Sequence, residues 1–585
     1  MLATKALAGP IAVAQPSGAW IGGNRPHNST RSNECKALSE TAFQTQMKGW
    51  AALAEIVFIR ILARVGALLA VLPSARMLRH CAGKIPAAFV TVSFSVTAYL
   101  RRDNARSMGD IVFHNTLGGQ NQPFVPLHPG KVRMYTCGPT VYDFAHIGNF
   151  RTFVFQDILR RFLRSRGFEV TQVTNFTDVD DRIIAKAAEA KLEIRDYTKK
   201  YIEAFLVDQR VLGIEKAEYT VRATDHIDDM VQLIERLTAK GFTYVSDGSI
   251  YFRISQFPNY GKLTNVDTSG IRAGARVDVD RYDKADARDF ALWKAPKPGE
   301  FFWETRIGAG RPGWHIECSA MSMKYLGETL DIHSGGVDLA FPHHENEIAQ
   351  SEAATGKQFV RYWLHAEHLL VDSQKMSKSL GNFYTLRDLL EKGNKPSTLR
   401  YLLASVPHRR QLNFSEESLQ QAASSVERLR NFATRLNTSK FPEGKSAISE
   451  SAERAREGFE RGLEDDLNTA QALAAVFELI REANGAMDEG DFRQGDVASV
   501  GKILESFDAI FGVLQDHDDE KLRLVGMDTR SSAPSKEKIE ELIAARQLAR
   551  RARDFAKADR IRVELAEQGI ILEDSKDGIV RWKHK

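Results

Sequence analysis

The strongest constraint on the fold is a strand, a turn, a helix and a second strand that follow one another within about 45 residues. Residues 131–136 have the pattern of a β-strand and lead into the turn CGPTVYDFAHIGN. Apolar residues then fall at helical spacing between residues 150 and 166, Gly167 ends this helix, and residues 169–173 alternate as the next strand. This order is a βαβ unit, so the sequence predicts a doubly wound α/β fold with a parallel sheet.

The next part of the chain interrupts this alternation. Residues 220–299 contain a helix, a hairpin-like piece at 249–253 and a charged loop at 278–288, which indicates an insertion between two halves of the sheet. A second strand–loop–helix block follows at residues 327–355. We therefore expect a Rossmann-like domain over residues 108–412 that carries an insertion at about 220–299.

The C-terminal third has a different pattern. Residues 413–515 are almost wholly helical in their periodicity, which predicts a helical domain. Residues 516–536 are polar and contain Gly526 and Pro534, as is typical of a linker. Residues 537–585 begin with a basic helix and end in short apolar pieces, so we expect a small terminal module.

The first 107 residues differ from the rest in charge. They hold 13 Lys or Arg against 4 Asp or Glu, a net charge of +9, whereas the remainder holds 67 against 72, a net charge of −5. A segment rich in Ala, Ser, Arg and Leu and poor in acids is typical of an organellar transit peptide. We expect residues 1–107 to be a disordered targeting extension that directs the protein to the chloroplast, the mitochondrion or both. The alternative is a gene model that starts upstream of the true start, at Met47, Met77 or Met108, which would leave the protein in the cytoplasm.

One apolar run in this extension could be mistaken for a membrane span. Residues 50–72 are interrupted by Glu55, Arg60 and Arg64. A central Arg costs roughly 2.5–3.5 kcal/mol on insertion scales. We therefore expect no membrane association.

The cysteines restrict the redox environment and the chemistry. Cys35 and Cys81 lie in the extension, and the remaining residues, about 480, contain only Cys137 and Cys318. Two cysteines cannot build a disulfide framework, so a reducing compartment is expected. These two residues are candidates for binding a metal or for catalysis.

The turn after the first strand ends in the motif HIGN, residues 146–149. The N-terminus of a helix presents unpaired N–H groups and a partial positive charge, which suit a phosphate. Gly148 allows a ligand to approach the backbone, and His146 and Asn149 can donate hydrogen bonds. Taken alone, a plain helix cap explains the motif equally well.

A second motif, KMSKS at residues 375–379, places Lys375 and Lys378 beside two serines in a loop before a helix. Such a loop can form a mobile cationic clamp for a polyphosphate, although most basic loops are simply solvated. HIGN after the first strand, followed later by KMSKS, is the paired signature of class I aminoacyl-tRNA synthetases.

Longer segments narrow this resemblance to cysteinyl-tRNA synthetase. They are YTCGPTVYDFAHIGNFRTFVF (135–155), NFTDVDDRI (175–183), GWHIECSAM (313–321), FPHHENEIAQSE (341–352) and VDSQKMSKSLGNF (371–383). The resemblance runs from about Gly109 to the C-terminus. It implies a class I catalytic domain of Rossmann-like parallel-sheet type with an insertion, followed by a helical tRNA-binding bundle and a small anticodon-binding module.

The residue types also suggest a metal site. Cys137, Cys318, His343 and Glu347 form a plausible set of two sulfurs, one nitrogen and one oxygen for tetrahedral zinc. His343 and Glu347 are four residues apart and share one helical face, whereas His344 at the same spacing meets the apolar Ile348. A solvated surface pair would show the same spacing. The resemblance places the zinc ligands of the family at these four positions and implies one Zn²⁺ ion per chain.

Zinc would explain how such an enzyme separates cysteine from serine. The two amino acids are near-isosteres, which apolar contacts discriminate poorly. Zinc binds a thiolate strongly and lowers the pKa of a bound thiol, whereas a hydroxyl is a poorer ligand.

The resemblance assigns further residues one by one. Their expected roles are phosphate stabilisation by His146, Asn149, Lys375 and Lys378; ATP binding by Gly148, Gly335, Gly336, Asp338 and Lys378; and cysteine binding by Gly138, Thr177 and Trp314. Mg²⁺ is expected to accompany ATP. An ordinary buried position is the alternative for Trp314. Asn149 replaces the second histidine of the family's HIGH form, and Ser334 stands where the family often has glycine.

The terminal module carries the strongest local positive charge. Seven basic residues are predicted on one helix: Arg546, Arg550, Arg551, Arg553, Lys557, Arg560 and Arg562. Such a face can neutralise RNA phosphates, but the interleaved acids would also suit a solvated helix. With the resemblance, we expect Arg550, Arg551 and Arg553 to bind tRNA and Trp582 to stack on an unpaired base.

The sequence thus predicts a cysteine–tRNA ligase that uses ATP, L-cysteine and cysteine tRNA. We expect it to be a monomer. Two alternatives are a ligase that transfers cysteine to an amino-sugar and a non-catalytic RNA-binding paralogue. The helical region and the basic terminal module favour tRNA over an amino-sugar, and the presence of both motifs and all four metal ligands favours an enzyme.

Overall fold

The structure is a computed structural model that describes residues 111–265, 288–377, 380–527, 536–567, 570–574 and 580–584. Residues 1–107 and 108–585 form separate units. The predicted transit extension lies outside the described residues, as do Lys378 and all but the last residue of the charged loop at 278–288. In the part of the chain that is described, no helix combines the length and the apolar character needed to cross a bilayer.

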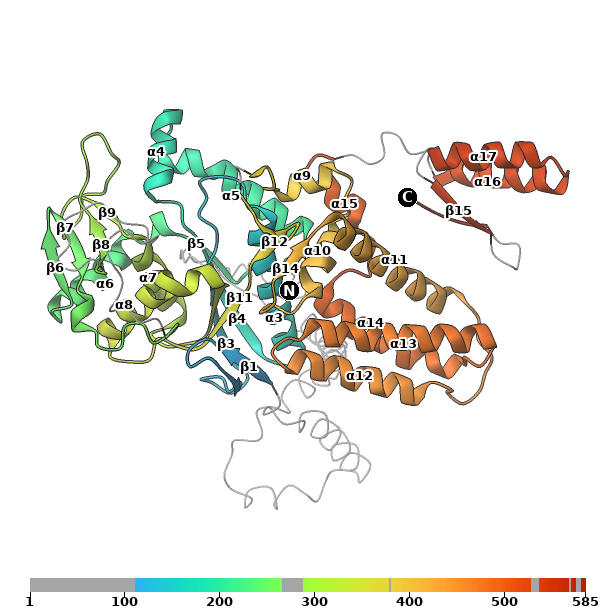
Figure 1. Ribbon diagram of the computed structural model, residues 1–585, viewed down its shortest axis with the longest axis horizontal. Coiled ribbons are helices and arrows are strands. Elements are labelled where there is room, and N and C mark those ends of the chain that lie inside the picture. Colours follow the sequence, from blue (N-terminus) through green and yellow to red (C-terminus); the bar gives the residue numbers. More distant parts are fainter. Residues whose placement is uncertain are drawn as a thin grey trace, which may run out of the picture. The chain divides into compact units, whose positions relative to one another are not determined.

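The domain that the sequence predicts to be Rossmann-like is built on a sheet of five parallel strands (Figure 1). In spatial order they are β11 (Val360–Ala366), β10 (Leu330–Gly336), β3 (Lys131–Thr136), β4 (Glu169–Phe176) and β5 (Tyr219–Arg222). Each neighbouring pair is parallel. The predicted Rossmann-like parallel sheet is therefore confirmed.

The βαβ unit that the sequence predicts consists of β3, α3 (Ile147–Ser165) and β4. Helix α3 begins with a capping box: the Asn149 N–H donates to the His146 ring at 3.2 Å, and the His146 N–H donates to Asn149 Oδ1 at 3.1 Å. Gly167 follows the helix with φ of +87°, a conformation that favours glycine. The HIGN motif is thus a helix cap as well as a candidate phosphate site.

The order in which strands are added to the sheet reverses between β3 and β10. From β3 it continues to β4 and β5 on one side, and it later returns to β10 and β11 on the other. Helix α7 (Trp314–Leu326) precedes β10, and α8 (Glu345–Thr355) connects β10 to β11. In open α/β sheets, ligands bind at the carboxyl ends of the strands beside such a switch point.

The insertion is longer at its C-terminal end than predicted. It contains α6 (Ile227–Ala239) and an antiparallel sheet of β6 (Thr243–Ser246), β7 (Ser249–Phe252), β8 (Phe290–Lys294) and β9 (Arg311–Pro312). Residues 219–222 belong to the central sheet because β5 pairs with β4, so the insertion begins after them and not at Thr220. It extends past Gly299 because β9 pairs with β8.

A smaller sheet and two helices follow the central sheet. The strands are β12 (Leu369–Val371), β13 (Gln374–Lys375) and β14 (Leu412–Phe414), and the helices are α9 (Leu386–Glu391) and α10 (Pro396–Ser405). Strand β13 carries the first lysine of KMSKS. Two further strands, β1 (Val112–Asn115) and β2 (Gln120–Pro123), form a hairpin that precedes the central sheet in the chain. Helices α4 (Asp181–Ala190) and α5 (Ile194–Val211) connect β4 to β5.

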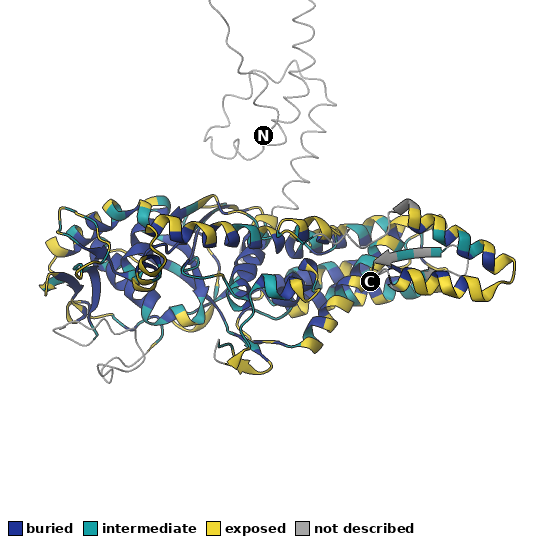
Figure 2. Cartoon of the chain, turned by 90° about the horizontal axis from the view of Figure 1, so that it is seen from above, coloured by how far each residue is buried: buried dark blue, intermediate teal, exposed yellow. Residues whose placement is uncertain are grey.

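In the helical domain, buried and exposed residues lie on different faces of the helices (Figure 2), and most of the buried ones are apolar. Its helices are α11 (Glu416–Thr438), α12 (Ser449–Glu464), α13 (Thr469–Glu489), α14 (Gln494–Phe511) and α15 (Asp518–Arg523). Helix α15 lies in the segment predicted as a linker. The first part of that segment is instead anchored, because the buried Asp518 binds the N-terminus of α10.

The terminal module has its own small apolar core. It consists of α16 (Lys536–Arg551), α17 (Phe555–Glu567), β15 (Ile570–Asp574) and β16 (Val580–His584), packed around Ile539, Ile543, Ile561, Leu565 and Ile570. The prediction of one basic helix is wrong. The chain turns at residues 552–554, where Arg553 has φ of +58°, so the basic residues are divided between two helices.

Candidate active site and metal centre

A cavity of about 440 Å³ opens at the carboxyl ends of β3 and β10. Thirteen of its lining residues are relevant here: Cys137, Gly138, His146, Gly148, Asn149, Thr177, Trp314, Cys318, Gly336, Asp338, His343, Lys375 and Met376. They come from segments that are distant in the sequence. The fold thus gathers most of the predicted site residues around one space.

The four predicted metal ligands meet beside this cavity. Cys137 directly follows β3, Cys318 lies in α7, His343 precedes α8, and Glu347 lies in its first turn. The Cys137 sulfur is 3.8 Å from the Cys318 sulfur, 3.7 Å from His343 Nε2 and 3.9 Å from Glu347 Oε1. His343 Nε2 is 3.1 Å from Glu347 Oε1. One donor atom from each residue lies within 4.8 Å of all the others.

This donor set fits a tetrahedral metal ion. Two sulfurs that each lie about 2.3 Å from a zinc ion at the tetrahedral angle are about 3.8 Å apart. All four residues are buried, and three of them line the cavity: Cys137, Cys318 and His343. A metal ion held by these donors would therefore face the cavity.

The electrostatics of the cluster favour a positive charge. The pKa of the Cys318 thiol falls to about 6 because Cys137 donates a hydrogen bond to it and His343 lies beside it. Burial alone would lower the pKa of His343, but hydrogen bonds to Cys318 and Glu347 raise it to about 10. Burial raises the pKa of Cys137 well above its ordinary value.

Further histidines surround the cluster, and the sequence reasoning did not assign them. His315 Nδ1 lies 2.9 Å from His343 Nδ1, and His333 Nε2 lies 3.0 Å from Glu347 Oε2. His344 Nδ1 lies 2.7 Å from His365 Nε2. Such neighbours fix the orientation and the tautomer of metal ligands. The local sequence gives no signal for these pairs, because they join residues of α7, β10 and β11 to α8 and to the turn that precedes it.

His344 is closer to the cluster than helical spacing suggests. Its Nε2 is 3.5 Å from the Cys137 sulfur, and Cys137, His333, His344 and Glu347 form a second group of donors within 4.8 Å of one another. Residues 340–344 form a wide turn with Phe341 in an extended conformation, so ideal helical spacing does not separate the two histidines. The cavity distinguishes the two histidines as candidate ligands, because His343 lines it, whereas His333 and His344 do not.

The predicted cysteine-binding residues lie next to the cluster. The Trp314 ring lies against the His343 ring, with centroids 4.3 Å apart and the ring planes tilted by 30°. The Gly138 N–H donates to Asn175 Oδ1 at 3.0 Å, and the Asn175 amide donates to Thr177 Oγ1 at 3.3 Å. Half-buried Trp314 lines the cavity and does not lie in a sealed core.

The HIGN turn and the segment that follows KMSKS are joined by the backbone. The Ile147 N–H donates to the Tyr384 carbonyl at 2.9 Å, and His146 and Thr385 form a bridge. A Cβ atom on Gly148 would lie 3.0 Å from the Met376 side chain. Exposed Lys375 lines the same cavity, whereas Lys378 lies outside the described residues.

Only some residues of the glycine-rich segment at the end of β10 line the cavity. Gly336 and Asp338 line the cavity, and a Cβ atom on Gly336 would lie 2.4 Å from Asp338 Oδ1. Gly335 is not among the lining residues, and its missing side chain would point toward Leu339 and His344.

In the terminal module, Arg550, Arg551 and Arg553 are exposed around the turn between α16 and α17. Trp582 packs, partly buried, against the apolar core of the module. Phe555, which the sequence reasoning missed, is 61% exposed at the start of α17, next to these arginines. The basic residues that precede Phe555 in the sequence could have indicated an RNA-binding role for it. A single aromatic residue in a helical pattern, however, is more often part of a core.

Three family models match successive parts of the chain. Residues 123–424 match the model described as "tRNA synthetases class I (C) catalytic domain". Residues 458–515 match the DALR domain, and residues 535–581 match the "Cysteinyl-tRNA ligase anticodon binding domain".

Whole-chain relatives agree with these matches. The cysteine–tRNA ligase of Solibacter usitatus (strain Ellin6076) is 58% identical over 474 residues, which cover 81% of this chain and 99% of the relative. That of Koribacter versatilis (strain Ellin345) is 54% identical over 490 residues, covering 80% and 99%. Among solved structures, Mycobacterium tuberculosis methionyl-tRNA synthetase with methionyl-adenylate has a TM-score of 0.51 at 16% identity, covering 68% of this chain and 94% of the other, which shows the fold alone.

Proposed function

The chain belongs to the cysteinyl-tRNA synthetase family and is a cysteine–tRNA ligase, and from this premise we propose which of its residues bind the metal, the cysteine, the ATP and the tRNA. We propose that Cys137, Cys318, His343 and Glu347 hold one zinc ion per chain. The observation that carries this proposal is the set of four buried donor atoms within 4.8 Å of one another, beside the cavity that HIGN and Lys375 also line.

When bound, zinc favours a thiolate over a hydroxyl as a ligand and thereby selects cysteine over serine. The protein residues around it position the rest of the amino acid. Trp314 covers one side of the pocket through its contact with His343. Thr177, held by Asn175, and the backbone at Gly138 lie where they can bind the polar groups of cysteine.

ATP would lie between the HIGN turn and the KMSKS loop. The N-terminus of α3 and the side chains of His146 and Asn149 can stabilise the α-phosphate, and Gly148 allows its close approach. Lys375 and Lys378 would neutralise the departing pyrophosphate, with Mg²⁺ on the phosphates. Gly336 and Asp338 would bind the nucleoside, with Gly335 shaping the segment behind them. The cysteine carboxylate is already a nucleophile at neutral pH, so positioning and charge stabilisation suffice.

The zinc proposal is tested by Cys318→Ser. We expect most of the bound zinc to be lost on elemental analysis, the KM for cysteine to rise, and the preference for cysteine over serine to fall. Ser322→Ala changes another buried residue of α7 and serves as the control. A full zinc complement in the Cys318 variant would refute this ligand set.

The clamp proposal is tested by Lys378→Ala and Lys375→Ala. We expect ATP–pyrophosphate exchange to slow by orders of magnitude while the zinc content stays unchanged. Lys357→Ala, which removes an exposed lysine paired with Glu328, is the control. An unaffected exchange rate in both clamp variants would exclude this role.

We further propose that the terminal module binds tRNA through Arg550, Arg551 and Arg553, with Trp582 or the more exposed Phe555 stacking on a base.

We propose that the enzyme is a monomer and acts in the chloroplast, the mitochondrion or both. The basic, acid-poor composition of residues 1–107 supports the organellar location. Fusion of these residues to a fluorescent protein tests it, because a purely cytoplasmic signal would contradict it.

A further inference from the structure

The rim of the active-site cavity carries an exposed aromatic side chain to which no role has been assigned so far. Phe144 lines the cavity and lies in the turn between β3 and α3, two residues before His146. It is 40% exposed, and among the cavity-lining residues that the structure describes it is the only large hydrophobic one that is exposed. Its ring is therefore accessible to a ligand that enters the cavity.

Three cations lie over the aromatic rings of this rim. The guanidinium carbon of Arg387 is 5.7 Å from the centroid of the Phe144 ring. The guanidinium carbon of Arg182 is 4.4 Å from the centroid of the Tyr142 ring, and Lys186 Nζ is 5.2 Å from it. Tyr142 and Arg182 also line the cavity. Aromatic rings next to cations are the surface with which proteins bind single-stranded nucleic acid.

Each of these cations also has an acidic partner. The pairs are Arg182 with Asp180 at 2.9 Å, Lys186 with Asp143 at 3.8 Å and Arg387 with Asp208 at 3.2 Å. The rim therefore offers flat stacking surfaces more than net positive charge. Binding there should depend on the bases of a nucleic acid and only weakly on its phosphates.

The turn that forms the rim is fixed by contacts with α5. The Tyr197 hydroxyl donates to the Tyr142 carbonyl at 3.0 Å. The Phe144 ring lies edge-to-face with the ring of buried Tyr201, with centroids 5.1 Å apart. The exposed ring is thus held in one orientation by a buried neighbour.

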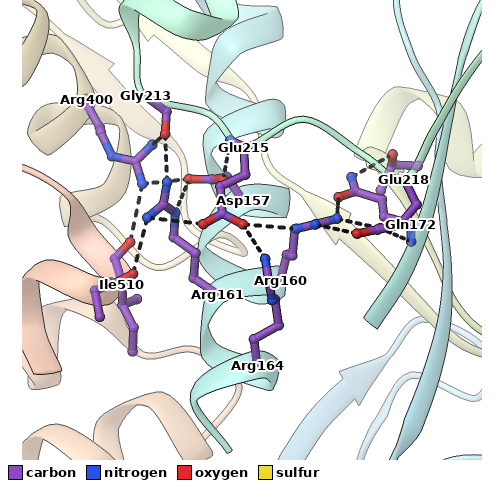
Figure 3. A network of polar contacts seen from close by, with 12 residues as sticks. Asp157, Arg160, Arg161, Arg164, Gln172, Gly213, Glu215, Glu218, Arg400 and Ile510 are labelled. Carbon is purple, nitrogen blue, oxygen red and sulfur yellow. Dashed lines mark hydrogen bonds and ion pairs between the residues drawn. The ribbon is translucent and has the colours of Figure 1, made fainter. Parts of the chain in front are cut away.

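The helix that follows this turn is fixed as well (Figure 3). Asp157 of α3 accepts hydrogen bonds from Arg161 at 2.8 Å and from Arg400 of α10 at 2.6 Å. Arg400 is fully buried and also donates to the Ile510 carbonyl at the end of α14 at 3.3 Å. A surface that is already formed loses little conformational entropy when a ligand binds to it.

The reaction determines which ligand reaches this rim. The acceptor of the cysteine is the terminal adenosine of the tRNA, which belongs to an unpaired 3′ end and must enter the cavity. The nucleotides next to it then lie at the mouth of the cavity. We propose that Phe144 stacks on a base of this unpaired 3′ end and that the Arg182 guanidinium, over Tyr142, supports a neighbouring nucleotide. This proposal rests on the proposed placement of cysteine and ATP in the cavity.

The test measures the affinity for intact cysteine tRNA and for the same tRNA trimmed of its unpaired 3′ end. Phe144→Ala should weaken binding of the intact tRNA roughly 10-fold, as is typical of a lost base–aromatic stack. It should leave binding of the trimmed tRNA unchanged, because the partner of the ring is then absent. The slope of log K against log salt concentration should not change, since no phosphate contact is lost.

Two further measurements separate this role from the binding of cysteine and ATP. In Phe144→Ala, transfer of cysteine from preformed cysteinyl-adenylate to subsaturating tRNA should slow, whereas ATP–pyrophosphate exchange and the KM for ATP should not change. Phe144→Tyr keeps the ring and should restore transfer. Because exchange needs no tRNA, the Cys318 and Lys378 variants test the placement of cysteine and ATP independently of the rim.

Phe302→Ala is the matched control. Phe302 of the insertion is also 40% exposed, and it does not line the cavity. An equal loss of affinity for intact and trimmed tRNA in Phe144→Ala would overturn the proposal, and so would unchanged binding of both. A raised KM for ATP would overturn it as well, because Phe144 would then contact the nucleotide substrate. The same loss in Phe302→Ala would show that the effect is not specific to the rim and would also overturn it.

Discussion

Gly138 shows how a single missing side chain keeps the catalytic turn in place. A Cβ atom at this position would lie 1.7 Å from the carbonyl oxygen of Asn175, and this neighbour is backbone. The Gly138 N–H also donates to the Asn175 side chain. The turn that follows Cys137 can therefore lie this close to the end of β4 only if position 138 is glycine.

Gly138→Ala should shift this turn and separate Gly138 from Thr177. We expect a loss of about 1–3 kcal/mol in the free energy of unfolding, as is typical of overpacking, and a strong fall in exchange activity. Urea unfolding and ATP–pyrophosphate exchange measure the two effects.

The control is Gly485→Ala in α13, where no atom lies within 4 Å of the added Cβ. This change should leave activity intact and stabilise the helix by up to about 1 kcal/mol. Equal effects of the two substitutions would contradict the steric explanation.

Asp208 gives the protein a pH-dependent component of stability. Burial raises its pKa to about 6, more than the ion pair with Arg387 at 3.2 Å lowers it. In the unfolded chain an aspartate has its ordinary pKa of about 4. As the pH rises between these two values, the unfolded state loses its proton first, so the free energy of unfolding falls.

We expect this fall to reach up to about 3 kcal/mol between pH 4 and pH 6. Asp208→Asn should remove it, which urea unfolding of the variant and the wild type across this range will show. Asp488→Asn, which changes an exposed acid paired with Arg435, is the control substitution. The same slope in the Asp208 variant and the wild type would contradict this assignment.

At the scale of elements, the break between α16 and α17 changes the expected RNA contact. Because Arg553 takes a left-handed conformation, the basic residues surround a helical hairpin and do not form one stripe. Arg550, Arg551 and Arg553 are exposed at this turn, and Phe555 follows them. An exposed ring beside several cations suits an unpaired base next to phosphates.

Arg551→Ala and Arg553→Ala should each raise the KM for cysteine tRNA and leave tRNA-independent exchange unchanged. Each lost phosphate contact should reduce the slope of log K against log salt concentration by about 1. Arg253→Ala, an exposed arginine of the insertion, is the control. Phe555→Ala should weaken tRNA binding without changing the salt slope, and an unchanged KM in all three module variants would exclude this surface.

At the scale of the whole molecule, the chain divides into residues 1–107 and 108–585. All described residues of the site belong to the second unit. A protein of residues 108–585 should therefore charge cysteine tRNA with a kcat/KM within about 2-fold of that of the full chain. Its net charge changes from +4 to −5, so it should bind an anion exchanger near neutral pH. A large loss of charging would mean that the first 107 residues contribute to the enzyme.

The local sequence determined the parts of this protein that depend on neighbours in the chain. The unit β3–α3–β4 follows from alternation, helical spacing and Gly167, and the HIGN cap follows from residues three apart. The resemblance carried by long ordered motifs also gave the four proposed metal ligands. In each case the information lies within short segments of the chain, each read by itself.

Tertiary structure alone decided which distant segments meet. The crossover from β3 to β10 brings Cys137 within 3.8 Å of Cys318, and the wide turn before α8 brings His344 as close as His343. The contacts of Arg151 and Asp518 with α10, and that of Arg400 in α10 with the end of α14, join residues that are more than 100 positions apart. Periodicity reports only the local environment of a residue, whereas these pairings depend on how the whole chain packs to bury its charged groups with partners.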